Sequence, residues 1–532
     1  MSFINISGLT FGYDGSYENI FENLSVFLDT DWRLGFIGRN GRGKTTLLRL
    51  LEGLYPYSGT IDSSVNFCYF PFSVENEHWN TLTVVRSIIA PFDEWERQMQ
   101  ECAESGDERL LLRYGDILEE YTARDGFIIN ELIERELGKL RVKADVLSRP
   151  FASLSGGEKT KLMLAALFLR KDSFSLIDEP TNHLDLLGRE AVSAYLAQQK
   201  GFILVSHDRA FLDGCIDHVL SLNRGGIEVQ RGTYSSWKEN LDRKNAQELA
   251  QNESLKKDIA RLEAARDTTA RWSDRVEKTK IGQRVSGVKP DRGHIGHQAA
   301  KLMKRARAIE HRRDEAAREK STLLKNLEES EPLKLTILTH HAPRLVEAEG
   351  LTIAYGDQPL FEPVSFTISS GQRLAVKGAN GSGKSSLLKL VCGEDIPHRG
   401  RLSLASGLVI SYVSQDTSHL RGGLREFAGQ EGVDESLFLA ILRKLDFARS
   451  QFEKDMAQFS AGQKKKVLLA KSLAQKAHLY VWDEPLNYVD VLSRIQLEEL
   501  LAAYCPAMLL VEHDAVFLSN IADKVLELHN YF

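Results

Sequence analysis

The chain has few cysteines and no long apolar segment. Its five cysteines are scattered and form no CxxC pair, which argues against a disulfide framework and fits a reducing cytoplasm. We expect all five to be small buried hydrophobes: Cys68, Cys102, Cys215, Cys392 and Cys505. No apolar run approaches the roughly 20 residues of a spanning helix. The Met-Ser-Phe start also lacks the features of a secretory signal, so the sequence predicts a cytoplasmic protein without a membrane segment.

The chain has only a small net charge, but basic residues are in excess in one segment. The 532 residues carry a net charge of −6, with 42% hydrophobic and 27% charged residues, as is usual for a globular protein of several domains. Between Arg271 and Arg313, however, thirteen Lys or Arg face four Asp or Glu. A basic segment on an acidic chain indicates a polyanionic partner that is met at one place.

Two sets of the same four motifs follow one another along the chain. The first set consists of GRNGRGKT from Gly38, LSGGE from Leu154, LIDEP ending at Pro180, and SHD around His207. The second set consists of GANGSGKS from Gly378, FSAGQ from Phe459, VWDEP ending at Pro485, and EHD around His513. We call these the first copy and the second copy, and their motifs predict two ATP sites.

The glycine-rich loops are predicted to hold phosphate. Each follows an apolar run that favours a strand and precedes a leucine-rich helix, so that backbone N–H groups and a helix N-terminus face the anion. Lys44 and Lys384 should reach the β- and γ-phosphates, and the hydroxyls of Thr45 and Ser385 should bind Mg²⁺. The other predicted nucleotide-binding residues of these loops are Gly38, Asn40, Gly41, Gly43, Thr46, Gly378, Asn380, Gly381, Gly383 and Ser386.

Acidic pairs at the ends of two apolar runs predict the hydrolytic chemistry. Asp178 and Asp483 should lie beside Mg²⁺, while Glu179 and Glu484 should act as general bases that orient the attacking water. His207 and His513 should sense or polarise the γ-phosphate. Two aromatic rings upstream of the loops, Tyr13 and Tyr355, are placed to stack on adenine, with packing in the core as the alternative.

The spacing of the motifs predicts an insertion in the first copy. The phosphate loops are 340 positions apart, whereas the signatures and the acidic pairs are 305 apart, so the first copy holds 35 extra residues. They fall in a predicted helical arm at about 86–140, where two segments show helical spacing of apolar residues. The predicted domains are 1–240 with this arm, a linker at 241–330, and 340–532.

The linker is predicted to be a basic helical hairpin. A heptad-like stripe runs along two segments on either side of a glycine-containing loop at about 272–298, which we expect to be the tip. The stripe consists of Leu255, Ile259, Leu262, Leu302, Ile309, Ala316 and Leu323.

The motif set resembles the ATP-binding cassette superfamily over both copies. The resemblance implies an α/β fold with two P-loop cassette domains joined by an antiparallel helical linker. It also implies that each signature completes the ATP site of the opposite copy, so that ATP joins the two. The signature residues implied to bind nucleotide are Ser155, Gly156, Gly157, Ser460, Gly462 and Gln463.

Within that superfamily the chain is similar to the non-transporter F class (ABC-F). The string from Pro180 to Asp185 (PTNHLD) matches its hallmark. The departures at Pro485–Asp490 (PLNYVD), together with GRNGRGK and DRGHIGHQAAKLMKRARAIE, resemble its antibiotic-resistance branch. This implies an ATPase with ATP and Mg²⁺ that works as a monomer on the 70S ribosome. It would contact large-subunit rRNA and tRNA through linker and arm, protecting against lincosamides, streptogramin A and pleuromutilins.

Three alternatives stay open on the sequence. A housekeeping ABC-F translation factor would share the fold and the ribosome but not the drug phenotype. The ATPase subunit of a drug exporter would have no use for a basic hairpin, and a chromosome ATPase would be expected to carry longer arms and a CxxC hook.

The two copies differ at one position that matters for catalysis. Gln415 in the second copy is placed to touch Mg²⁺ and water, whereas the first copy has Phe72 there. Phenylalanine cannot bind a metal, so the sequence predicts an inferior site on Lys44.

The predicted hairpin tip provides a first test. Replacing Ile281, Arg284 or Val285 by Ala should abolish drug protection while ATPase activity and ribosome association stay near normal, because the tip is the part that could reach a drug site. Drug susceptibility of cells expressing each variant measures the first effect. Full protection by a variant with a shortened loop that still binds ribosomes would move the mechanism to the arm or the two ATPase copies.

Overall fold

The structure is a computed structural model that describes most of the two copies. The described residues are 2–13, 19–105, 108–171, 173–223, 226–248, 250, 251, 253, 254, 257, 311, 333–355, 358–529 and 531. The chain divides into two compact units, one of which contains both copies and the other residues Lys238–Glu329. The predicted linker stripe and the tip at 272–298 lie outside the described residues.

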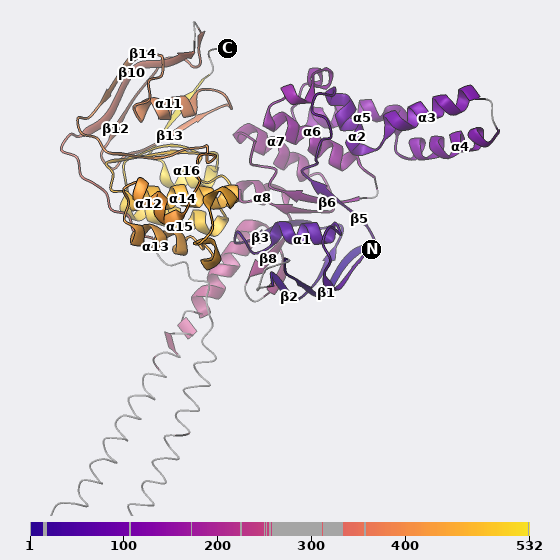
Figure 1. The fold of residues 1–532 in the computed structure, drawn as a ribbon, viewed down its shortest axis with the longest axis horizontal. Helices are drawn as coiled ribbons and strands as arrows, with labels where there is room; N and C mark the ends of the chain where they lie inside the picture. Colours follow the sequence, from indigo (N-terminus) through magenta and orange to yellow (C-terminus); the bar gives the residue numbers. More distant parts are fainter. Residues whose placement is uncertain are drawn as a thin grey trace, which may run out of the picture. The chain divides into compact units, whose positions relative to one another are not determined.

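The first copy is built around a six-stranded sheet in the order β5-β6-β7-β3-β8-β9, parallel except for β9 (Figure 1). Its central strands are continuous apolar runs because parallel strands are covered on both faces. A smaller antiparallel sheet, β2-β1-β4, packs with α1 to close one core. The strands are β1 (Phe3–Phe11), β2 (Phe21–Asp29), β3 (Arg33–Gly38), β4 (Ser58–Ser63), β5 (Asn66–Phe70), β6 (Ser173–Asp178), β7 (Phe202–Val205), β8 (His218–Asn223) and β9 (Gly226–Arg231).

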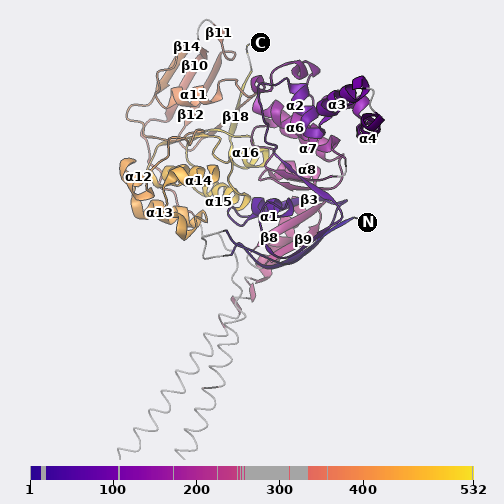
Figure 2. The same cartoon turned by 45° about the vertical axis from the view of Figure 1, so that its right-hand side comes forward.

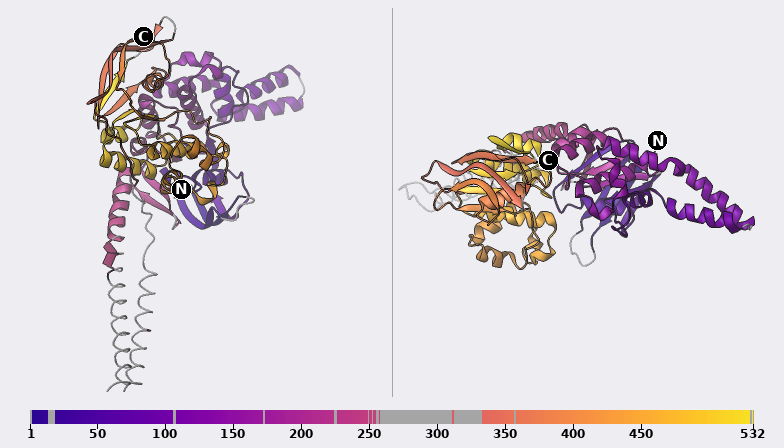
Figure 3. Two further views of the ribbon diagram at one scale, coloured as in Figure 1. Left: turned by 60° about the vertical axis from the view of Figure 1, so that its left-hand side comes forward. Right: turned by 90° about the horizontal axis from the view of Figure 1, so that it is seen from above.

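Helices of the first copy include the predicted arm. Two helices, α3 and α4, lie in the segment predicted to form the arm; they run side by side and extend beyond α2 (Figures 1 and 3). The helices are α1 (Lys44–Leu51), α2 (Thr81–Ile89), α3 (Phe92–Ser105), α4 (Glu108–Ala123), α5 (Ile129–Lys139), α6 (Gly156–Leu169), α7 (Leu186–Leu196) and α8 (Arg209–Cys215).

The second copy repeats this plan. Its main sheet is parallel, in the order β15-β16-β17-β13-β18, and β10 pairs with β11, β12 and β14 in antiparallel fashion. The strands are β10 (Arg344–Tyr355), β11 (Gln358–Pro359), β12 (Val364–Ser369), β13 (Arg373–Gly378), β14 (His398–Leu404), β15 (Ile410–Val413), β16 (Leu479–Asp483), β17 (Met508–Val511) and β18 (Lys524–Leu528).

A helical lobe of the second copy packs against one large apolar core, with α12 and α13 beside α14 and α15 (Figure 2). The helices are α11 (Lys384–Val391), α12 (Leu424–Gln430), α13 (Glu435–Lys444), α14 (Ala461–Ala474), α15 (Val491–Tyr504) and α16 (Ala515–Ile521). The fold class expected from the sequence, α/β with two P-loop domains, is confirmed.

The cysteines follow the expectation only in part. All five are free; Cys68, Cys102 and Cys215 are buried, but Cys392 is half-buried and Cys505 is exposed. The expectation of burial is wrong for Cys505 because this residue ends α15 in a left-handed conformation, outside the core. Within the described part of the chain, no helix is both long and apolar enough to cross a membrane.

Candidate functional site

Strand register brings the predicted acids and histidines together. Asp178 at the end of β6 pairs with Val205 at the end of β7, and His207 follows two residues later. In the second copy Asp483 pairs with Val511 in the same way, two residues before His513. Because the carboxyl ends of parallel strands share one edge of the sheet, each acidic pair, histidine and phosphate loop meet there.

Each phosphate loop turns from a strand into a helix through left-handed glycines. Gly43 has φ 94°, and a Cβ there would lie 2.5 Å from a side-chain carbon of Ile20. Gly383 has φ 86°, and a Cβ there would lie 2.9 Å from Leu360. Glycine is therefore required for both conformation and space, and the first N–H groups of α1 and α11 are left to face a ligand.

A buried ammonium group lies over each loop. Lys44 Nζ donates to the carbonyl oxygens of Gly38 at 2.7 Å and Arg39 at 3.2 Å. Lys384 Nζ donates to the carbonyls of Gly378 at 3.0 Å and Ala379 at 2.8 Å. Burial lowers the pKa of both lysines because it disfavours the charged ammonium group. An anion such as phosphate would stabilise that charge.

The strand-end aspartates differ in their partners. Asp178 Oδ2 accepts hydrogen bonds from Thr45 Oγ1 at 2.7 Å and from Tyr69 Oη at 2.9 Å. Among the described residues, neither carboxylate oxygen of the buried Asp483 has a hydrogen-bond partner. Burial raises the pKa of Asp483.

These groups fit a magnesium ion. Hydroxyl and carboxylate oxygens are its preferred ligands, and Mg²⁺ is usually held by one or two carboxylates together with substrate phosphates. Across the residues that the structure describes, no group of three or more His, Cys, Asp or Glu forms a dedicated metal cage. An unpartnered buried carboxylate at Asp483 is the kind of group that a cation would satisfy.

The glutamates that follow the aspartates lie beside the histidines. His207 Nε2 is 3.3 Å from Glu179 Oε1, and His513 Nε2 is 3.6 Å from Glu484 Oε1. Burial and the charge of Asp178 raise the pKa of Glu179 to about 8. Burial and the nearby Lys44 hold the pKa of His207 well below its usual value, so this ring is neutral.

Glu484 has a different environment. Its Oε2 accepts hydrogen bonds from Gln415 Nε2 at 2.8 Å and Asn487 Nδ2 at 2.6 Å. Although burial favours the neutral acid, His513 and Lys384 hold the pKa of Glu484 below its usual value. The two glutamates therefore differ: their surroundings raise the pKa of Glu179 and lower the pKa of Glu484, which is ionised at neutral pH.

One cavity of about 980 Å³ contains residues of both copies. It joins the phosphate loop, acidic pair and histidine of the first copy to the signature of the second. Of the predicted residues it is lined by Tyr13, Asn40, Gly41, Gly43, Lys44, Thr45, Thr46, Asp178, Glu179, His207, Ser460, Gly462 and Gln463.

Contacts between the copies are also made near Lys384. Asn380 Nδ2 donates to the carbonyl of His183 at 3.5 Å, and Gly378 and His513 line a cavity of about 440 Å³ that also includes Asp185. Gly156 and Gly157 lie so close to His183 that a Cβ on either would approach it within 3.2 Å. Gly381 of the second phosphate loop has a left-handed conformation, with φ 80°.

The signatures open two helices. Ser155 caps α6 and Ser460 caps α14, each in a capping box with Glu158 or Gln463 three residues later. The two tyrosine rings that are predicted to stack on adenine are exposed beside the phosphate loops. The hydroxyl groups of Tyr13 and Thr46 lie 3.0 Å apart, and those of Tyr355 and Ser386 lie 3.1 Å apart.

Several contacting residues were missed by the sequence analysis. Asn487 holds Glu484, and the carbonyl of Tyr488 accepts a hydrogen bond from Asn40 of the other copy at 2.8 Å. A Cβ at Gly462 would lie 2.5 Å from that carbonyl, which explains the glycine. The sequence Pro485–Asp490, directly after the acidic pair, could have indicated Asn487 and Tyr488 as site residues. Tyr69, which donates a hydrogen bond to Asp178, lies in no recognisable motif.

Comparison with known proteins identifies the family. The model of the ABC transporter family matches residues 21–182 and 361–487, more than half of the chain. The chain belongs to the ABC transporter family. It is accordingly an ATPase with two ATP-binding cassettes.

The chain is similar to three bacterial proteins over nearly all of its length. Putative ATP-binding protein YdiF of Bacillus subtilis (strain 168) is 30% identical, with 99% of this chain and 79% of that protein covered. Ribosome protection protein VmlR of the same strain is 28% identical (97% and 85%). Energy-dependent translational throttle protein EttA of Escherichia coli (strain K12) is 27% identical (96% and 89%). These relatives place the chain among homologues of the ABC-F class.

A solved structure shares the fold. The archaeal ribosome recycling factor aABCE1, crystallised with the stalk protein aP1, aligns with 98% of this chain and 87% of its own at a TM-score of 0.57 and 18% identity.

A buried ion pair connects the cassettes on one side only. The guanidinium of Arg209, two residues after His207, binds the carboxylate of Glu498 and lies 3.5 Å from Asp514, next to His513. When the motifs of the two copies are aligned, Ala515 corresponds to Arg209 and Ser193 corresponds to Glu498, and these two residues cannot form an ion pair. The contact therefore joins the two histidine loops asymmetrically.

The two glutamates should contribute unequally to turnover. Steady-state ATPase assays should show a larger loss for Glu484→Gln than for Glu179→Gln, by several-fold, because Gln415 orients an ionised Glu484 while Phe72 offers nothing comparable. As a matched control, Gln415→Phe should lower the ATPase rate of the second site toward that of the first. Indistinguishable losses in the two glutamine variants would show that the difference has no catalytic effect.

The ion pair between the cassettes gives another test. Arg209→Ala leaves the carboxylate of Glu498 buried without its counter-charge, which should cost about 3 kcal/mol of stability, whereas Asp514 keeps its ion pair with Arg494. The double variant Arg209→Ala/Glu498→Gln should recover part of that loss in thermal unfolding and in ATPase rate. A single variant no worse than the double would mean that the pair does not connect the cassettes energetically.

Proposed function

We propose that the chain is a cytoplasmic ABC-F ATPase that closes around ATP and binds the ribosome as a monomer, leaving after hydrolysis. The observation that carries this proposal is the cavity of about 980 Å³ between the phosphate loop of one cassette and the signature of the other. ATP bound there would contact both cassettes at once, and its hydrolysis would remove part of that contact. A cycle of closing and opening follows.

The site residues have separate roles in this proposal. Lys44, Lys384 and the loop N–H groups bind the β- and γ-phosphates, and the signatures complete the sites. Glu179 and Glu484 orient water, and His207 and His513 respond to the γ-phosphate. Mg²⁺ would be held by Thr45 and Asp178, or by Ser385, Gln415 and Asp483, and when bound it neutralises charge on the phosphates.

The ribosome is the proposed partner. Support comes from VmlR and EttA, whose names state ribosome protection and control of translation, and from the basic segment between Arg271 and Arg313. A hairpin at 241–330 with its tip at 272–298 would contact large-subunit rRNA and tRNA, aided by the arm at 86–140. The cassettes at 1–240 and 340–532 would supply the clamp.

Protection from drugs at the peptidyl-transferase centre is the specific role that we propose. It rests on the linker string and on the departures at Pro485–Asp490. A housekeeping translation factor is the second candidate, and the similarity to EttA, close to that of VmlR, favours it. Susceptibility to lincosamides, streptogramin A and pleuromutilins in cells with and without the protein distinguishes the two.

Loss of both glutamate carboxylates tests the clamp. Glu179→Gln/Glu484→Gln keeps shape and hydrogen bonding but loses both bases, so ATP should hold the cassettes closed. We expect the double variant to co-sediment with ribosomes in ATP and to arrest translation in a cell-free system.

The control keeps these substitutions and adds Lys44→Met and Lys384→Met, which remove the ammonium groups that lie over the two loops and would bind the phosphates. That protein should sediment with ribosomes no better in ATP than without nucleotide. Equal recovery of ribosomes by the double variant with and without ATP would contradict the clamp.

A further inference from the structure

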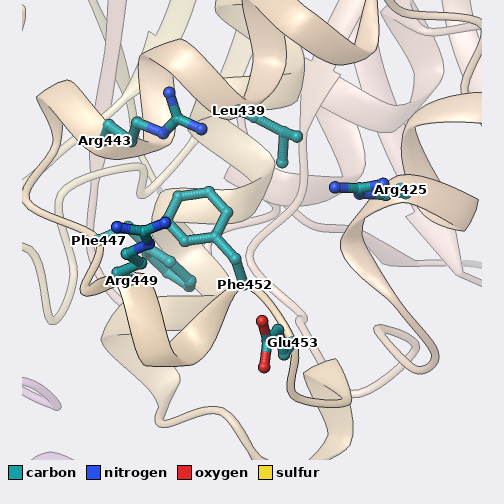
Figure 4. A pocket seen from close by; sticks show the side chains of 7 residues that line it. All are labelled: Arg425, Leu439, Arg443, Phe447, Arg449, Phe452 and Glu453. Carbon is teal, nitrogen blue, oxygen red and sulfur yellow. The ribbon is translucent and has the colours of Figure 1, made fainter.

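The helical lobe of the second cassette contains a basic cavity that the ATP sites do not use. It has a volume of about 780 Å³ and lies between α12, α13 and the chain that follows α13. Arg425 extends from one wall toward the side that carries Arg443, Arg449 and Phe452 (Figure 4). The remaining lining residues are Leu439, Phe447 and Glu453.

The charges of this cavity are poorly neutralised. Three guanidinium groups face one lining carboxylate, that of Glu453. Arg425 has a loose ion pair with Glu435 at 3.4 Å, and both side chains are at least half exposed. Within the described part of the chain, Arg443 and Arg449 have no carboxylate within ion-pair distance. Such a site attracts an anion, and guanidinium groups suit phosphate because they donate two parallel hydrogen bonds.

Aromatic rings supply a second kind of contact. The guanidinium of Arg443 lies 5.7 Å from the centre of the half-buried Phe452 ring. Phe452 packs edge-on against the buried Phe447 at 5.5 Å, and Phe447 packs against Phe459 of the signature at 5.3 Å. A ring braced in this way, beside arginines, is suited to stacking a planar base.

The cavity is a feature of the second cassette alone. A left-handed residue at the end of each lobe helix, Arg141 with φ 55° and Asp446 with φ 60°, fixes the register between the copies. In that register the first copy has no arginine or phenylalanine to match. Its residues are Gly138 for Arg443, Val142 for Phe447, Ala144 for Arg449 and Leu147 for Phe452.

We infer that this cavity binds a nucleotide, with its base against Phe452 and its phosphate held by Arg425, Arg443 and Arg449. The inference goes beyond the proposed ribosome function and does not depend on it. Phe447 also lines the cavity of the ATP site built on Lys44, and Arg39 of that phosphate loop lies 3.4 Å from Asp446. An occupied cavity would therefore restrain the same segment that contacts the ATP site.

Photochemical crosslinking of the full chain tests the inference without ribosomes. The probe is a short single-stranded RNA that contains 4-thiouridine. The RNA and the protein are irradiated together, and the modified peptide is then mapped. We expect a crosslink at or beside Phe452. Arg443→Ala/Arg449→Ala should reduce its yield by about fivefold or more, because two phosphate contacts are lost. Absence of any crosslink between Leu439 and Glu453 would overturn the inference.

Matched variants separate a built site from general attraction. Arg399→Ala/Arg401→Ala removes the same charge from exposed positions on β14 and should leave the crosslink near the unaltered level. Phe452→Leu keeps an apolar side chain but removes the ring face, and it should lower the yield. An equal loss in the two arginine pairs would also overturn the inference.

Competition with uridine monophosphate identifies the source of the nucleotide. If the free nucleotide displaces the crosslink, the cavity takes a soluble nucleotide; if only unlabelled RNA does so, the cavity takes a nucleotide of an RNA strand. Both results support the site. Because no ribosome is present, failure of ATP-dependent ribosome binding leaves this outcome unaffected.

Discussion

A buried ammonium group at the start of α1 and of α11 is the feature on which both ATP sites depend. Removing such a charge from water is costly unless polar groups surround it. The loop carbonyls of Gly38 and Gly378 provide those groups, which forces each loop to wrap closely around its lysine. Only glycine tolerates the resulting left-handed turns. The same wrapping aims the first N–H groups of the helix at the place where phosphate would lie, so charge burial and anion binding have one structural cause.

The two sites share this framework but differ in their electrostatics. Asp178 is hydrogen-bonded by Thr45 and Tyr69, and burial together with the charge of Asp178 raises the pKa of Glu179. Asp483 has no such partners, while Gln415 and Asn487 hold an ionised Glu484. Duplicated motifs have therefore produced unequal environments. The ion pair from Arg209 to Glu498, absent from the mirror side, connects these unequal halves through their histidine loops.

The helical lobe of the second cassette connects separate parts of the molecule. Its signature caps α14 and enters the ATP site of the first cassette, where Gly462 permits close contact with Tyr488 and Asn40. Its Asp446 meets Arg39 of the opposite phosphate loop, and Phe447 lies between that site and the basic cavity. A force or ligand that moves this lobe must alter packing at the ATP site, because the side chains are shared.

The sequence by itself determined the motif positions, the strands and helices that carry them, the insertion of the arm, and the duplicated α/β plan. These follow from local patterns: glycine spacing, apolar runs that end in acids, and helical periodicity. Tertiary structure alone decided which groups neutralise which charges. The raised pKa of Glu179, the orphaned carboxylate of Asp483, the contact of Gln415 with Glu484, the Arg209 pair and the exposure of Cys505 all depend on how the folded chain packs. Burial and pairing are properties of assembled surfaces, and no local pattern specifies them.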